Sequence, residues 1–223
     1  MSDDLRDSIA RLHDRIERAG RDPASVTVIA VTKGFGIDVV EDALSAGLVD
    51  LGENYAQDMR AKVDALDLAQ RAQVRWHFIG RLQSNKVRLI AGDVTLWQSV
   101  DRSSVAREIA KHAAGAAVLV QVNTSNEPQK GGCEPGEVAR LVGECRELGL
   151  SVHGLMCVGP ADAPTEARTA FRLLGSLADD LGLHERSMGM SDDLEIALEE
   201  GSTMVRVGTA LFGRRPAPPG SRR

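Results

Sequence analysis

The sequence lacks the features that mark several large classes of protein. Its 223 residues contain no apolar run close to the roughly 20 residues of a membrane span, and the opening MSDDLRDSIA lacks the basic-then-apolar order of a signal peptide. With 27 Lys and Arg against 32 Asp and Glu, the chain has no basic excess with which to bind nucleic acid. We therefore expect a cytoplasmic protein that binds neither membranes nor nucleic acid.

Cysteine is also scarce. The three cysteines, Cys133, Cys145 and Cys157, are odd in number, and no CxxC pair is present to hold a metal or a redox disulfide. We expect thiols without a function, and no metal site. No internal low-complexity block or second-domain boundary interrupts the chain, so its organisation favours one domain.

What is present is a regular alternation of strand and helix patterns, which is typical of repeated βα units. Apolar residues recur at helical spacing near the start of the chain and predict an opening helix that ends before Pro23. Eight strands are predicted further along, at 26–31, 48–53, 75–80, 94–100, 117–123, 152–159, 186–188 and 202–208.

Eight strands with amphipathic helices between them predict a (β/α)8 TIM barrel, an α/β fold whose usual length of about 250 residues is close to that of this chain. A doubly wound open sheet is the alternative, because alternation alone does not show that the sheet closes. We expect a single domain over residues 1–213, with the opening helix added to the barrel. Residues 214–223, rich in Pro and Arg, are predicted to form a flexible tail.

The candidate site follows from the barrel, because residues at the carboxyl ends of its strands face the active mouth. Ser187, Gly208 and Thr209 could offer hydroxyl and backbone donors to a phosphate near the last two strands. Arg206 lies two residues before Gly208 and points to the same side of its strand. A simple strand-to-helix turn at Gly208 and a salt bridge of Arg206 are the alternatives.

Lys33 ends the apolar run VTVIAV, where a buried strand meets the rim of its sheet. Only five of the 27 cationic residues are lysines, so Arg is the usual cation of this chain. An amine can lose its proton and attack a carbonyl, which a guanidinium cannot do. Lys33 is therefore either a Schiff-base amine or a solvated strand end.

Five motifs, in order, span nearly the whole chain: AVTK at 30–33, LGENYAQD at 51–58, WHFIGRLQSNKVRLI at 76–90, GLMCVGP at 154–160 and SMGMSDDLEIALEEGSTMVRVGTALFG at 187–213. Together they resemble the pyridoxal phosphate homeostasis protein family. The resemblance implies a barrel like the N-terminal domain of bacterial alanine racemase, holding pyridoxal 5′-phosphate (PLP) as a lysine aldimine. The residues that it implies are Lys33 as the Schiff-base lysine, Ser187, Gly208 and Thr209 in a phosphate cup, Arg206 facing the pyridine nitrogen, and Asn54, His77 and Met156 around the cofactor ring.

Two departures from the family pattern concern loops at the rim. GFG follows Lys33 where relatives often carry a threonine- or proline-containing turn, and Arg81 stands where a smaller residue or proline is common. Both put the shape of the loops and access to the site in doubt, rather than cofactor binding.

The expected function is to hold PLP rather than to use it. An arginine beside the pyridine nitrogen leaves the ring unprotonated, which makes PLP a poorer electron sink. Alanine racemase takes its second base from a tyrosine of a further domain, whereas the only tyrosine here is Tyr55, in a different motif. The resemblance thus implies a monomeric, non-enzymatic carrier that serves intracellular PLP homeostasis and delivers PLP to apo forms of PLP-dependent enzymes.

Three alternatives remain at this point. The first is a single-domain PLP-dependent amino-acid racemase or lyase, with Lys33 as its base and help from His77 or Tyr55. The second is a PLP-free Schiff-base aldolase in which Ser187, Gly208 and Thr209 hold a sugar phosphate. The third is a regulatory interaction protein for which PLP is only a ligand.

Overall fold

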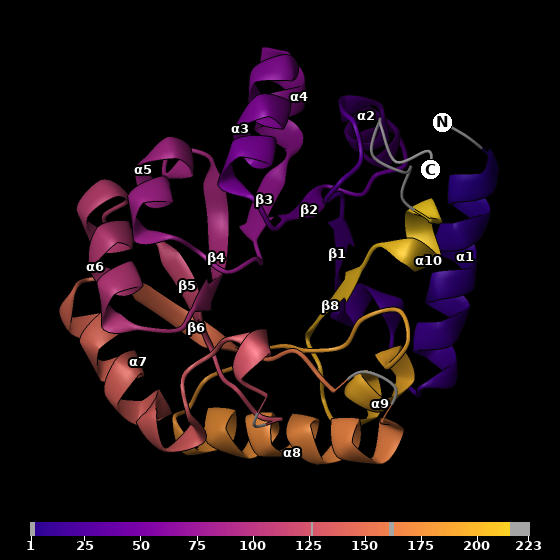
Figure 1. Ribbon diagram of the computed structural model, residues 1–223. Helices are drawn as coiled ribbons and strands as arrows, with labels where there is room; N and C mark the ends of the chain where they lie inside the picture. Colours follow the sequence, from indigo (N-terminus) through magenta and orange to yellow (C-terminus); the bar gives the residue numbers. More distant parts are fainter. Residues whose placement is uncertain (1–2, 126, 161–162, 215–223) are drawn as a thin grey trace, which may run out of the picture.

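Eight parallel strands close into a barrel in a computed structural model, which describes residues 3–125, 127–160 and 163–214 (Figure 1). The strands are neighbours in chain order, and β1 pairs with both β2 and β8. This closure confirms the predicted barrel, and the open-sheet alternative is wrong. The strands are β1 (Thr27–Val31), β2 (Asp50–Glu53), β3 (Arg75–Phe78), β4 (Val94–Val100), β5 (Ala117–Gln121), β6 (Ser151–Met156), β7 (Glu185–Ser187) and β8 (Met204–Val207).

Helices form the outer ring of the barrel (Figure 1). They are α1 (Asp3–Arg18), α2 (Ile37–Ser45), α3 (Ala56–Ala65), α4 (Leu68–Gln73), α5 (Val87–Ile90), α6 (Ser103–His112), α7 (Val138–Glu147), α8 (Pro164–Asp180), α9 (Leu194–Glu199) and α10 (Thr209–Phe212). Four single 3-10 turns join them: η1 (Pro23–Ser25), η2 (Ser84–Lys86), η3 (Pro128–Lys130) and η4 (Pro135–Glu137). Within the described ranges, none of the helices has both the length and the apolar character needed to cross a membrane.

The opening helix α1 has the predicted place outside the βα repeat. It buries Leu5, Leu12 and Ile16 and lies against α10 and α9, beside the last strand of the barrel (Figure 1). The ends of the described chain therefore meet at this part of the ring. Residues 215–223 of the predicted tail lie outside the described residues.

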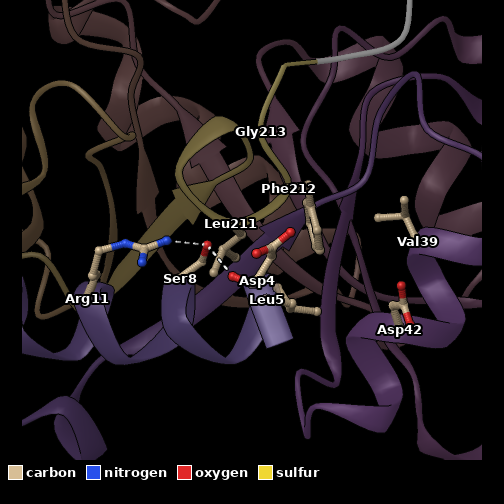
Figure 2. A pocket seen from close by; sticks show the side chains of 9 residues that line it. All are labelled: Asp4, Leu5, Ser8, Arg11, Val39, Asp42, Leu211, Phe212 and Gly213. Atoms are coloured by element: carbon tan, nitrogen blue, oxygen red, sulfur yellow. Dashed lines mark hydrogen bonds between the residues drawn. The ribbon is translucent and has the colours of Figure 1, made fainter. Parts of the chain in front are cut away.

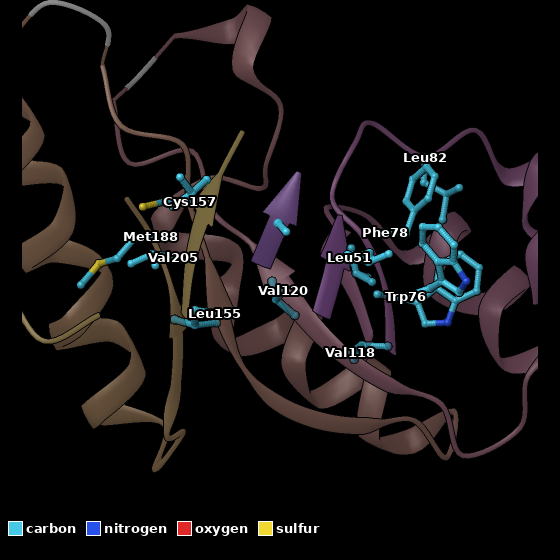
Figure 3. Close-up of a cluster of buried hydrophobic side chains, with 14 of the residues drawn as sticks. Leu51, Trp76, Phe78, Leu82, Val118, Val120, Leu155, Cys157, Met188 and Val205 are labelled. Carbon is cyan, nitrogen blue, oxygen red and sulfur yellow. The ribbon is translucent and has the colours of Figure 1, made fainter. Parts of the chain in front are cut away.

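The strands bury apolar side chains on both faces, as expected of a parallel sheet covered by helices. Figure 3 shows part of the larger cluster, in which the outward faces of the strands pack against the helices. A smaller apolar cluster fills the inside of the barrel and consists of Ile29, Leu96, Leu119, Met156 and Met204.

Cys145 and Cys157 are buried, and burial raises the pKa of each thiol to about 11.

Candidate functional site

A cavity of about 350 Å³ opens where the carboxyl ends of several strands meet. In a (β/α)8 barrel this is the end that carries the chemistry. Two basic side chains, one carboxylate, two hydroxyl groups and an amide contribute to its walls, together with apolar residues. The lining residues are Val31, Lys33, Asn54, Ile79, Val158, Met190, Ser191, Asp192, Arg206, Gly208 and Thr209.

Lys33 reaches the cavity because a tight turn follows β1. Val31 is the last strand residue, and the N–H of Phe35 donates to the carbonyl of Thr32 across 3.1 Å, which closes the turn around Lys33. Gly34 has φ of 75°, a left-handed conformation that a residue with a side chain rarely adopts. The first glycine of GFG therefore makes the turn that leaves Lys33 at the mouth of the barrel.

A buried ion pair supports this turn from below. The ammonium of Lys62 donates to the carboxylate of Glu53 and, across 2.7 Å, to the carbonyl of Thr32. The Thr32 hydroxyl donates to the same Glu53 oxygen across 2.6 Å. Lys62 is 6% exposed and Glu53 is fully buried, so the pair joins the end of β1 to β2 and α3 away from water.

Arg206 occupies the floor of the cavity and is only 5% exposed. One terminal nitrogen donates to the hydroxyl of Ser187 across 2.7 Å, and the other donates to the carbonyl of Cys157 across 2.7 Å. Burial lowers the pKa of Arg206, while the nearby carboxylate of Asp193 acts in the opposite direction. A guanidinium has five N–H donors, so Arg206 keeps donors beyond these two bonds.

A line of hydrogen bonds continues from Ser187 through the inside of the barrel. The Ser187 hydroxyl donates to Gln98 across 2.6 Å, and the amide nitrogen of Gln98 lies 2.9 Å from Nδ1 of His77. An amide nitrogen only donates, so Nδ1 accepts and the ring proton is on Nε2. Nε2 then donates to Asp50 across 2.9 Å, and Arg75 binds the same carboxylate through both of its oxygens.

Asp50 ends this line at the opposite, amino-terminal end of the strands. Burial alone would raise the pKa of its carboxyl group, but the hydrogen bonds from His77 and Arg75 outweigh burial and lower it. The Arg75 side chain is 57% exposed, so the line ends at a solvated cation. The barrel interior thus connects the floor of the cavity to solvent on the far side through fully bonded side chains.

The loop between β7 and α9 brings Ser191 to the cavity. Asp193 is buried and accepts a hydrogen bond from the N–H of Met190, which holds the loop from within. From outside, Arg15 of α1 binds both carboxylate oxygens of Glu195, at 2.6 and 2.7 Å. It also donates to the carbonyl of Ser191 across 2.8 Å, so the opening helix fixes this wall of the cavity.

Five of the eight residues predicted to bind the cofactor line this cavity: Lys33, Asn54, Arg206, Gly208 and Thr209. The other three lie deeper, outside its described lining. Met156 belongs to the inner apolar cluster, and His77 and Ser187 belong to the hydrogen-bonded line. Ser191 lines the cavity without having been predicted as a site residue, although it is the second serine of the quoted motif SMGMS.

A separate cavity of about 380 Å³, shown in Figure 2, lies between α1, α2 and α10. Two of its polar side chains are bonded within its wall, since Arg11 donates to the Ser8 hydroxyl and Ser8 donates to the carbonyl of Asp4, both across 2.9 Å. No barrel strand contributes to its described lining, and its acidic residues Asp4 and Asp42 do not suit an anion. It therefore offers no alternative to the cavity at the barrel mouth.

Comparison with known proteins gives a consistent result. The family model "Alanine racemase, N-terminal domain" matches residues 3–216. The pyridoxal phosphate homeostasis protein of Pseudomonas aeruginosa is 42% identical over 92% of each chain, and that of Aquifex aeolicus is 39% identical over 93% of this chain and 95% of its own. The structure of PipY from Synechococcus elongatus with PLP bound has a TM-score of 0.80 and 29% identity, covering 94% of this chain and 100% of PipY.

Proposed function

The chain belongs to the pyridoxal phosphate homeostasis protein family, and from this premise we propose that it binds PLP in the cavity around Lys33. The observation that carries the proposal is the presence of Lys33 and Arg206 in one cavity, together with the hydroxyl groups of Ser191 and Thr209. The PLP-bound structure of PipY supports it.

The lining residues fit the parts of PLP. When bound, PLP supplies an aldehyde that reacts with a primary amine, an aromatic ring that withdraws electrons, and a phosphate. Lys33 provides the amine at one wall of the cavity. We assign the phosphate to Ser191 and Thr209, with the backbone of Gly208 beside them in the lining. A Cβ at position 208 would lie 3.3 Å from the carbonyl oxygen of Val31, so packing against β1 also favours glycine there.

Arg206 is suited to the ring nitrogen. It has N–H groups to donate and no atom that accepts, so a ring nitrogen beside it receives a hydrogen bond and gains no proton. Ser187 and the carbonyl of Cys157 hold the guanidinium in one orientation. The buried line below Arg206 therefore positions the group that controls the electronics of the ring.

We propose a carrier role that serves PLP homeostasis, with delivery to apo enzymes and without robust turnover. Racemisation needs a base on one face of the reacting carbon to remove its proton and an acid on the other face to return one. Among the described lining residues the ionisable side chains are Lys33, Asp192 and Arg206, and Asp192 is exposed. Tyr55, which is 62% exposed, lines a neighbouring cavity instead. These positions support holding the cofactor more than acting through it.

The test is an absorbance spectrum of the purified protein with added PLP, followed by borohydride reduction and peptide mapping. We expect a band in the violet, and a reduced adduct on Lys33 that is absent in Lys33→Ala. Lys111→Ala is the matched control, because the Lys111 side chain is 66% exposed and lies on α6. The absence of a band, or an adduct spread over several lysines, would refute the proposal. Sustained turnover of an amino acid that depends on Lys33 would instead favour the racemase or lyase alternative.

A further inference from the structure

A second cavity, of about 500 Å³, opens at the same mouth of the barrel. Residues that follow β2 and β3 form most of it, and the start of α6 closes one side. The lining residues are Asn54, Tyr55, Ala56, Gln57, Phe78, Arg81, Leu82, Gln83, Lys86 and Arg102. Asn54 also lines the cavity of Lys33, so a shared wall separates the two.

This cavity contains five residues of the motif WHFIGRLQSNKVRLI, which contributes one residue to the cavity of Lys33. Only Ile79 of that motif lines the cofactor cavity, whereas Phe78, Arg81, Leu82, Gln83 and Lys86 line the second one. The motif thus contributes to both cavities, and its polar side chains Arg81, Gln83 and Lys86 line the second.

The charge of the second cavity has a single sign. Three of its ten lining residues are cationic and none is acidic, in a chain whose net charge is −5. Arg102 is occupied, because it pairs with Asp101 and donates to the carbonyl of Leu82 across 2.8 Å. Arg81 and Lys86 form no ion pair with the described residues. Two uncompensated cations at a concave surface attract an anion.

The second cavity also suits the aromatic part of a small anion. Phe78 and Leu82 are each 1% exposed, and Phe78 is held by Trp97, with ring centroids 6.1 Å apart. The exposed ring of Tyr55 lies on the rim. Phe78 and Leu82 therefore support the wall from behind, and the ring of Tyr55 is the aromatic surface that a ligand can contact.

The wall between the cavities carries an unsatisfied polar atom. Oδ1 of Asn54 is buried and has no hydrogen-bond partner among the described residues. Gly80 packs against the backbone of Asn54, since a Cβ at position 80 would lie 2.1 Å from the backbone carbonyl oxygen of Asn54. The close backbone contact with Gly80 therefore fixes this wall in place.

From these features we propose that the second cavity binds a small aromatic anion, with its phosphate or carboxylate at Arg81 and Lys86 and its aromatic part against the exposed ring of Tyr55. The identity of the anion rests on the proposed function, whereas the binding of an anion does not. If PLP binds at Lys33, a phosphorylated B6 compound that enters or leaves the cavity of Lys33 is one such anion. An unrelated phosphate or carboxylate has the same chemistry, and the test separates these sources.

The test uses the full chain loaded with PLP and reduced with borohydride, so that the cavity of Lys33 is already filled. Calorimetric titration with pyridoxine 5′-phosphate, which has no aldehyde, should show about one further site. Arg81→Gln or Lys86→Gln should weaken it at least about tenfold, the loss of one charge-assisted hydrogen bond. Lys86→Arg should retain binding. Arg88→Gln is the matched control, because Arg88 is exposed on α5 and lies outside the described lining.

The alternative probes are inorganic phosphate and 4-pyridoxic acid. Tighter binding of pyridoxine 5′-phosphate than of inorganic phosphate identifies the B6 compound as the ligand class, and equal binding identifies phosphate alone at the same cations. No binding of any probe, or equal binding in Arg81→Gln, Lys86→Gln and the control, would overturn the proposal. If the protein takes up no PLP, the same titration on Lys33→Ala still decides it, because dependence on Arg81 rather than Thr209 locates the site.

Discussion

Arg206 donates a hydrogen bond to the hydroxyl of Ser187 across 2.7 Å, beneath the cavity that contains Lys33. Ser187 is fully buried, and its hydroxyl donates a hydrogen bond to Gln98. Its hydroxyl is therefore engaged on both sides before any ligand arrives. This places Ser187 under Arg206 as a support and leaves Ser191 as the serine at the cavity surface.

The two serines should respond differently to removal of the hydroxyl. Ser191→Ala should weaken PLP binding by roughly 1 to 3 kcal/mol, because a phosphate oxygen loses a hydrogen-bond donor. The free energy of unfolding should change little. Ser187→Ala should lower the free energy of unfolding by about 1 to 3 kcal/mol, because two buried groups lose their partner. PLP titration and urea denaturation of both variants measure the two effects. A larger loss of PLP affinity in Ser187→Ala than in Ser191→Ala would return the phosphate to Ser187.

Asp50 makes the stability of the protein depend on pH. The pKa of its carboxyl group is lower in the folded protein than the ordinary value of 3.8. Its contribution is therefore complete above that value, and it is lost as the pH falls through the folded pKa. Asp50→Asn should cost about 1 to 3 kcal/mol of unfolding free energy at pH 7, and the gap to the unaltered protein should narrow below pH 3.8.

Urea denaturation between pH 3 and 7 measures this gap. Asp58→Asn is the control, since Asp58 is exposed on α3, and its effect should stay within about 0.5 kcal/mol. A gap that is constant over the whole pH range would show that the carboxylate of Asp50 does not carry the stabilisation.

The buried pair of Lys62 and Glu53 predicts a large effect of a single substitution. Lys62→Met removes the cation and leaves a fully buried carboxylate, which should destabilise the protein by about 3 to 5 kcal/mol. Adding Glu53→Gln should recover part of this loss, because the stranded charge is gone. Thermal or urea unfolding of the single and double variants tests the pair, with Lys111→Met as an exposed control. Equal losses in the single and double variants would exclude a charge penalty.

Arg15 predicts a link between the opening helix and cofactor affinity. Arg15→Lys keeps the charge but loses the planar fork that binds Glu195 and the carbonyl of Ser191. We expect a loss of roughly 1 kcal/mol in stability and a several-fold faster release of PLP, because the Ser191 wall loosens. Arg18→Lys, on the exposed side of α1, should change neither. Unchanged release in Arg15→Lys would show that the wall is held by Asp193 alone.

The sequence predicted the barrel because most of its strands and helices bury apolar residues at the spacing typical of that element. The strand patterns give β4 at its observed bounds and β7 one residue from them. The short helix α4 is not predicted, because it has no buried residue and thus no apolar stripe. Its only signal is the capping box formed by Asp67 and Gln70.

The candidate site was less predictable, because the pattern of residues in a strand does not show how deep each side chain lies inside the barrel. Residues two apart in a strand share a face but lie at different heights along it, so Arg206 reaches the cavity while Met204 lies in the inner cluster. The motifs predicted His77 and Met156 around the cofactor ring, and their heights put them below the lining of the cavity of Lys33. The heights depend on the stagger between strands, which only the closed sheet fixes.

The hydrogen bonds between Arg206 and Asp50 all run in one direction. Water in ice can donate in several ways, so ice retains proton disorder and residual entropy. The inside of this barrel has no such freedom, because a guanidinium that only donates stands at one end and a carboxylate that only accepts stands at the other. The hydroxyl, amide and imidazole between them each have a single allowed orientation. The protein therefore folds around one arrangement of protons, whose bond dipoles add along the barrel instead of cancelling.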